Sequence, residues 1–206
     1  MKIIKGRAFS GELKQSISNI LIFSFLLLLV FGSCSEQKPL PENIYNAANA
    51  VQLKETGRYE SSIAVYSYLL KQLDPAKDCS NFNKYRIEIT DLLRLSGKFE
   101  SARNLLNDID TVKCTDSHNK FEYSLVAGKL EYDTRNYTSA LVKFESTLNI
   151  GNDIFGKNSP QSAECFSSIG KCYLSLNNYP EAKKYFDLSY AIKKDNIVSG
   201  RKTLIA

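Results

Sequence analysis

The sequence predicts an all-α protein made of about four helical hairpins stacked as a solenoid. Three features recur along its 206 residues: an aromatic ring after a short polar turn, a small residue three positions later, and a large residue four positions after that. Self-similarity at a fixed period is typical of arrays in which each unit is one pair of helices. Successive rings are 40, 38 and 42 residues apart, at Tyr59, Phe99, Tyr137 and Tyr179.

The amino-terminal segment carries the signature of an export signal. Residues 1–19 hold four basic residues and one acidic residue, and an apolar run of twelve residues follows from Ile20 to Phe31. As a helix this run would measure about 18 Å, which is shorter than the roughly 30 Å hydrocarbon core of a bilayer. A signal peptide therefore fits better than a spanning helix. The alternative is an uncleaved signal anchor that keeps residues 1–33 as a membrane helix.

The end of this segment resembles the lipobox of bacterial lipoproteins. Gly32 and Ser33 stand directly before Cys34, behind the apolar run, although Phe31 occupies a place where leucine is usual. The resemblance implies that residues 1–33 are a lipoprotein signal peptide and that the thiol of Cys34 is acylated. Two or more acyl chains hold a protein on a bilayer stably, so membrane lipid is an expected partner through Cys34.

The rest of the chain divides into three further segments. Residues 34–42 are polar and contain two prolines, so they are expected to form a lipid-anchored tether. Residues 43–192 are expected to form the repeat domain. Residues 193–206 are expected to be a C-terminal tail or an incomplete cap: either a short helix near 201–206 covers the last hairpin, or the chain is a shortened relative of a longer protein.

The fourth unit shows the hairpin pattern most clearly. Apolar residues at three- and four-residue steps predict the first helix, and Asn177 suits the left-handed turn at its end. Asn178 can cap the next helix, and Pro180 suits its first turn. The first helix is expected to pack through Phe166, Ile169, Tyr173 and Leu176, and the second through Tyr179, Ala182, Tyr185, Phe186 and Ser189.

These residues, together with the small Gly170, resemble the tetratricopeptide repeat. The units here are longer than the usual 34 residues, and in this they are similar to the variant repeat of kinesin light chains. The extra residues are expected to lengthen the second helix or the loop after it. The resemblance implies a right-handed superhelix whose first helices line a concave groove for a peptide or protein partner.

Groove positions of the repeat provide candidate binding residues. Their cations could bind an acidic peptide or a carboxyl terminus, and Lys129 and Lys171, which occupy the same place in neighbouring units, are expected to lie close together. The alternative is that these side chains are only a solvated surface. The candidates are Lys54, Arg94, Lys129, Tyr132 and Lys171.

No reactive centre is visible in the sequence. The single histidine, His118, is expected in a loop without ligands at metal spacing, and phosphate-binding loops and hydrolase motifs are lacking. We therefore expect no enzyme activity, metal or cofactor. Most of the net charge of +5 comes from the first nineteen residues, which argues against nucleic-acid binding.

Four cysteines lie beyond Cys34. Cys165 and Cys172 are seven residues apart on one predicted helix, too far for a disulfide, and are expected to be small core residues. Cys79 and Cys114 follow the second helices of adjacent units, where an oxidising compartment would allow a disulfide between them. Unpaired thiols are the alternative.

The pattern as a whole favours a membrane-anchored scaffold for protein–protein interaction in a bacterial cell envelope, with the outer membrane favoured over the inner. The alternatives are a sensory or regulatory repeat module of an envelope signalling system, and an outer-membrane assembly factor.

Overall fold

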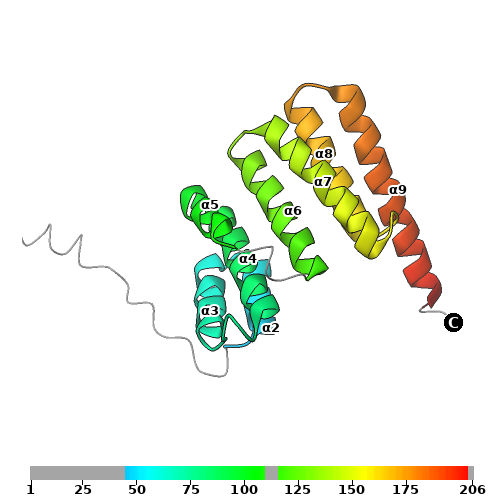
Figure 1. Cartoon of the computed structure of the whole chain (residues 1–206). Coiled ribbons are helices and arrows are strands. Elements are labelled where there is room, and N and C mark those ends of the chain that lie inside the picture. The colour runs from blue at the N-terminus through cyan, green and yellow to red at the C-terminus, as the bar shows by residue number, and fades with distance from the viewer. Residues whose placement is uncertain (1–44, 110–115, 204–206) are drawn as a thin grey trace, which may run out of the picture. The chain divides into compact units, whose positions relative to one another are not determined.

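The computed structural model of the chain describes residues 45–109 and 116–203, with side chains up to residue 197. These residues form eight helices and no strands, which confirms the all-α prediction. The helices follow one another as four hairpins (Figure 1). The hairpins are α2 (Ala47–Glu55) with α3 (Tyr59–Lys71), α4 (Cys79–Leu95) with α5 (Phe99–Asn107), α6 (Ser117–Asp133) with α7 (Tyr137–Phe155), and α8 (Pro160–Ser175) with α9 (Tyr179–Thr203).

The predicted signal peptide, residues 1–33, and the predicted tether, residues 34–42, lie outside the described residues. The repeat domain was expected from Asn43, and its first described helix begins at Ala47, capped by the side chain of Asn46, which accepts from the amide of Asn49 at 2.9 Å. None of the described helices is both long and apolar enough to cross a bilayer.

The turn inside each hairpin has the same backbone geometry in all four units. One residue adopts the left-handed conformation, and the amide of the next donates to a carbonyl five residues back, as Arg58 does to Leu53 and Asn178 to Tyr173, both at 2.8 Å. This pattern ends a helix with its last carbonyls satisfied. The recurring ring then begins the second helix. The left-handed residues are Gly57, Gly97, Arg135 and, as predicted, Asn177.

Close packing inside the hairpins depends on small residues. The four positions predicted to be small are all buried, and in the first hairpin the hydroxyl of Ser62 donates to the carbonyl of Ala50 at 2.7 Å. In the third hairpin a Cβ on Gly128 would lie 2.6 Å from Cε1 of Phe144, and in the fourth a Cβ on Gly170 would lie 2.9 Å from the ring of Phe186. Each ring therefore occupies the space that a side chain would need.

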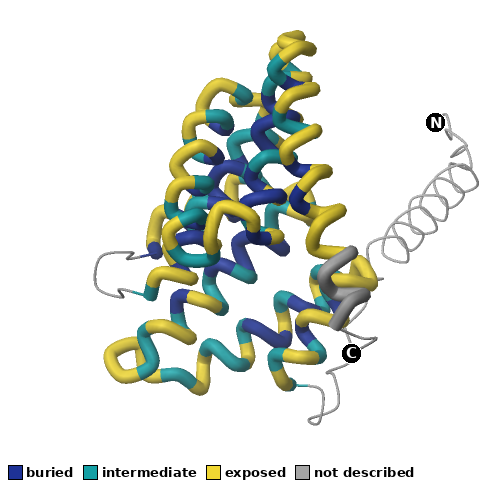
Figure 2. The backbone as a smooth tube through the Cα atoms, turned by 90° about the vertical axis from the view of Figure 1, so that its right-hand side faces the viewer, coloured by how far each residue is buried: buried dark blue, intermediate teal, exposed yellow. Residues whose placement is uncertain are grey.

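Apolar clusters join the second, third and fourth hairpins to one another. The second and third hairpins share a cluster that includes Ile87, Leu106 and Leu130. The third and fourth share a cluster around Phe144 and Ile169. Buried positions accordingly lie between the helices, and exposed ones lie on their outer sides (Figure 2). This burial between units is what an isolated hairpin lacks.

The last hairpin departs from the predicted packing. Tyr179 is 61% exposed and Leu176 is 40% exposed, although both were expected in packed stripes, while Ala182 and Ser189 are buried as expected. The three earlier rings of the series are half-buried. The difference arises because no further helix in the described chain covers α9.

The repeat body also extends past the boundary predicted at residue 192. Helix α9 continues without a break to Thr203, so the expected tail is helical over residues 193–203. The sequence from 193 to 199 contains no glycine or proline that would end a helix. The extra length of the repeats lies partly in the second helices, as expected, since α7 has 19 residues and α9 has 25.

Replacing Gly128 by alanine should lower the free energy of unfolding by about 1–2 kcal/mol. Overpacking a core costs about 1–3 kcal/mol, and alanine recovers at most about 1 kcal/mol over glycine in a helix. Urea unfolding measures the difference. If the ring of Phe144 is the obstacle, Gly128→Ala should cost less in a Phe144→Leu background; an equal loss in both backgrounds would contradict this explanation.

Candidate functional site

A hollow of about 560 Å³ is lined by residues of α4, α6, α7, α8 and α9. Four of the five predicted groove residues line it, and Lys54 does not. Lys129, on α6, and Lys171, on α8, both line it. We call it the α8–α9 hollow; its lining residues are Arg94, Lys129, Tyr132, Asp133, Phe144, Pro160, Glu164, Ser167, Ser168, Lys171 and Lys193.

Helix α8 contributes one continuous face to the hollow. Pro160, Glu164, Ser168 and Lys171 recur at steps of three and four residues, which places them on one side of a helix. The start of the helix is fixed by Ser159, whose hydroxyl accepts from the amide of Ser162 at 3.1 Å, and by proline in its first turn.

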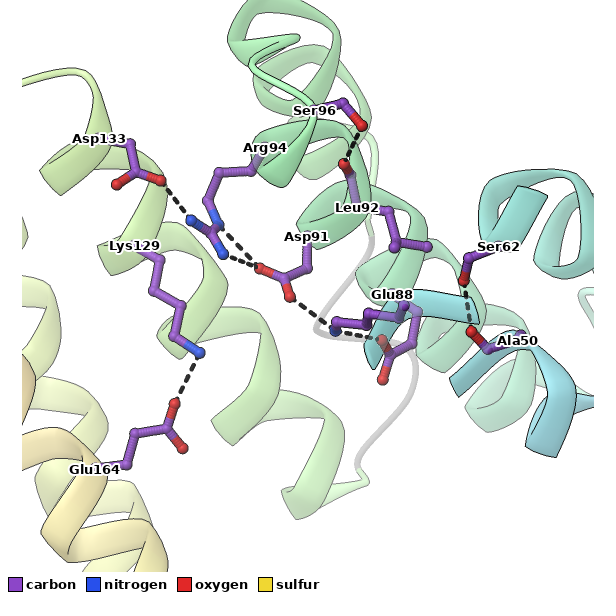
Figure 3. A network of polar contacts seen from close by, with 11 residues as sticks. Ala50, Ser62, Glu88, Asp91, Leu92, Arg94, Ser96, Lys129, Asp133 and Glu164 are labelled. Atoms are coloured by element: carbon purple, nitrogen blue, oxygen red, sulfur yellow. Dashed lines mark hydrogen bonds and ion pairs between the residues drawn. The ribbon is translucent and has the colours of Figure 1, made fainter. Parts of the chain in front are cut away.

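A chain of ion pairs crosses the first three hairpins. Lys54 of α2 lies 2.9 Å from Oε2 of Glu88 and 2.8 Å from Oδ2 of Asp91, both on α4. Arg94 donates to Oδ1 of Asp91 through Nε and Nη2, at 2.9 and 2.8 Å, and pairs with Asp133 of α6 (Figure 3). The pairs therefore link α2 to α4 and α4 to α6.

Two further contacts link α6 to α8. Nζ of Lys129 lies 2.8 Å from Oε1 of Glu164, a pair also visible in Figure 3. The hydroxyl of Tyr132 lies 3.1 Å from Oγ of Ser175. Of the predicted groove residues, only Lys171 has no hydrogen bond or ion pair among the described residues.

The ion-pair chain is strongly coupled. Burial lowers the pKa of Lys54, but the charges of Asp91 and Glu88 together raise it by more, so the net shift is upward. Burial raises the pKa of Asp91, and Lys54 and Arg94 lower it more, so the net shift is downward. Burial lowers the pKa of Arg94, and Asp91 and Asp133 raise it above its ordinary value. The shifts keep these groups charged at neutral pH.

Sequence reasoning missed the acidic partners and Lys193. The groove positions of one unit identify its cations, whereas the acids that pair with them lie in the next unit, as Asp91, Asp133 and Glu164 do. Lys193 was missed because it follows the predicted end of the repeat body. Both signals were present in the sequence.

The described residues offer binding groups and no metal cluster. No three His, Cys, Asp or Glu side chains gather within residues 45–109 and 116–203 in a way that could hold a metal ion. His118 lies in the first turn of α6 and not in a loop, and its ring packs edge-on against Phe155 with centroids 5.1 Å apart. Asp116 caps this helix and so converts the expected loop into helix.

The cysteines divide into two kinds. Cys165 and Cys172 are free and fully buried, as predicted for core residues, and burial raises the pKa of Cys165 to about 12 and that of Cys172 to about 11. Cys79 is disulfide-bonded. Cys114 and Cys34 lie outside the described residues, so the pairing of Cys79 with Cys114 stays a prediction, as does the acylation of Cys34.

Replacing Asp91 by asparagine should lower the free energy of unfolding at pH 7 by about 2–3 kcal/mol, because Lys54 and Arg94 lose their shared counter-charge in a largely buried place. Urea unfolding measures the loss. The matched control is Asp187→Asn, which removes an exposed pair with Lys183 and should change stability by less than about 0.5 kcal/mol.

The same variant should change the pH dependence of stability. The pKa of Asp91 is below its ordinary value of 3.8, so its stabilisation is present above that pH and is lost as the pH falls through the lower folded pKa. The difference in the free energy of unfolding between wild type and Asp91→Asn should therefore become smaller below about pH 4. If this difference were the same at all pH values, the charge of the Asp91 carboxylate would not be the cause of the lost stability.

Comparisons with known proteins agree with this architecture. Residues 124–195, from within α6 to within α9, match the family model described as tetratricopeptide repeat, over less than half of the chain. The crystal structure of BtubC (BKLC) from P. vanneervenii is similar, with a TM-score of 0.57 and 19% identity over 89% of this chain and 77% of that one. The curated proteins give no match. The chain is thus an all-α solenoid of hairpins that are similar to tetratricopeptide repeats.

Proposed function

We propose that the chain is an interaction scaffold that binds a segment of another protein in the α8–α9 hollow. The observation that carries the proposal is the hollow itself, in which cations, hydroxyls and a tyrosine converge from four helices. Tetratricopeptide-repeat hairpins are typically binding surfaces and not catalysts. The described part of the hollow offers groups that hold a ligand in place.

The charges of the hollow favour an acidic segment. Four cations line it, and only two carboxylates, Asp133 and Glu164, oppose them. The surplus of two positive charges attracts carboxylates and repels basic segments, so it selects partners by charge. Ser167 and Ser168 add hydroxyl groups that can donate to a carboxylate or to a peptide carbonyl.

We propose further that the scaffold is attached to a membrane of a bacterial cell envelope through acyl chains on Cys34. The support is the sequence Gly32-Ser33-Cys34 behind an apolar run of twelve residues. Residues 35–42, if extended, would allow the repeat body to stand about 25 Å from the lipid. The outer membrane is favoured over the inner.

Photo-crosslinking tests the scaffold function. A photoreactive amino acid at Ser167, in the hollow, should form a covalent adduct with another protein when the full chain is irradiated in its own membranes. The same group at Val142, which is 62% exposed on α7 and does not line the hollow, is the control. Adducts that form equally at both places, or at neither, would refute the proposal.

Labelled palmitate and mass spectrometry test the lipid attachment. The mature chain should begin at Cys34 and carry the label, and Cys34→Ala should lose the label and retain residues 1–33, because cleavage follows acylation in lipoproteins. If the segment is instead an uncleaved signal anchor, residues 1–33 will be present in both proteins and neither will carry the label.

A further inference from the structure

We infer that Lys171 and Lys193 are the residues that recognise the acidic segment, and that the other predicted cations of the groove serve the stack instead. The inference rests on the proposed function, since it names which part of the surface makes the contact. It follows from how the charges are distributed over the four hairpins.

The predicted groove cations of the first three hairpins already have counter-charges. Lys54 is held by Glu88 and Asp91, Arg94 by Asp91 and Asp133, and Lys129 by Glu164. A carboxylate from a partner would have to displace an internal acid from each of them. The internal acid is already positioned and partly desolvated, so such an exchange would bring little net gain.

The situation differs between α8 and α9. Lys171 and Lys193 line the same hollow from two helices, both are exposed, and neither forms an ion pair with the residues that the structure describes. Ser167 and Ser168 lie on the same wall. The surplus charge of the hollow is therefore located on these two lysines.

Two separate lysines suit a particular ligand. An ammonium group is a compact charge on a flexible stem, whereas arginine offers a planar fork for one bidentate carboxylate. Lysines on two helices can each meet a different carboxylate of one chain. The geometry points to a peptide segment with at least two acidic side chains, which would lie across α8 next to Tyr132 and Pro160.

Helix α9 is essential to this arrangement. Lys193 lies one residue past Ile192, in the part of α9 that continues beyond the expected end of the repeat body. A chain whose last helix ended at residue 192 would keep Lys171 and lose the second cation. The long helix therefore completes the recognition site.

The test uses the full chain in detergent micelles and two fluorescein-labelled peptides, one rich in glutamate and one with glutamine in its place. Fluorescence anisotropy should show binding of the glutamate peptide only. The double variant Lys171→Glu with Lys193→Glu should weaken this binding by about tenfold or more, because both contacts become repulsive. Lys171→Arg with Lys193→Arg should retain it, because both positions stay positively charged.

Two controls make the result specific. Lys120→Glu with Lys194→Glu changes the net charge equally at exposed positions outside the hollow and should leave the affinity unchanged. Lys54→Met removes a cation that already has internal partners and should leave it unchanged as well. Circular dichroism establishes that each variant is folded.

Several outcomes would overturn the inference: equal binding of the two peptides, no binding of either, or a loss in the control variants as large as in Lys171→Glu with Lys193→Glu. Failure of the proposed function itself looks different, because then crosslinking from Ser167 yields no specific adduct. If Ser167 forms its adduct but the double variant binds the glutamate peptide unchanged, the scaffold function stands and the role of the two lysines is refuted.

Discussion

Close approach of the two helices in each hairpin is the constraint on which the rest of the molecule depends. The rings of Phe144 and Phe186 fit only because Gly128 and Gly170 leave space for them. In the first hairpin, Ser62 takes the small position and ties the helices through the carbonyl of Ala50. With this spacing set, the next first helix can pack onto the pair, and the inner faces of α2, α4, α6 and α8 come close enough to exchange ion pairs.

Those ion pairs give the side of the stack formed by α2, α4, α6 and α8 two regions of different character. From α2 to α6 the side chains satisfy one another, through Lys54, Asp91 and Arg94. A ligand would gain little free energy there, because its charges would have to displace acids that are already in place. In the fourth hairpin, Lys171 and Lys193 form no ion pair with the residues that the structure describes, so their positive charges are available to a ligand.

The sequence predicted the repeat architecture well because its determinants are local. Turn geometry at Asn177 and small residues such as Ala182 depend on neighbours within one hairpin, and these follow from spacing alone. The exposure of Tyr179 and the continuation of α9 depend on what comes after the fourth hairpin, which periodicity does not specify. The pairing of groove cations with Asp91 and Glu164 depends on contacts between units, so charge and position within one unit do not tell which cations already have a counter-charge.

The separation of compensated and uncompensated charge has a consequence for how the molecule would respond to ionic strength. Mobile ions screen exposed charges over about 8–10 Å and act much less on buried pairs. Added electrolyte would therefore leave the link between Arg94 and Asp91 largely intact while it shields Lys171 and Lys193. A change in the ionic environment could release a bound partner from a scaffold that itself stays folded.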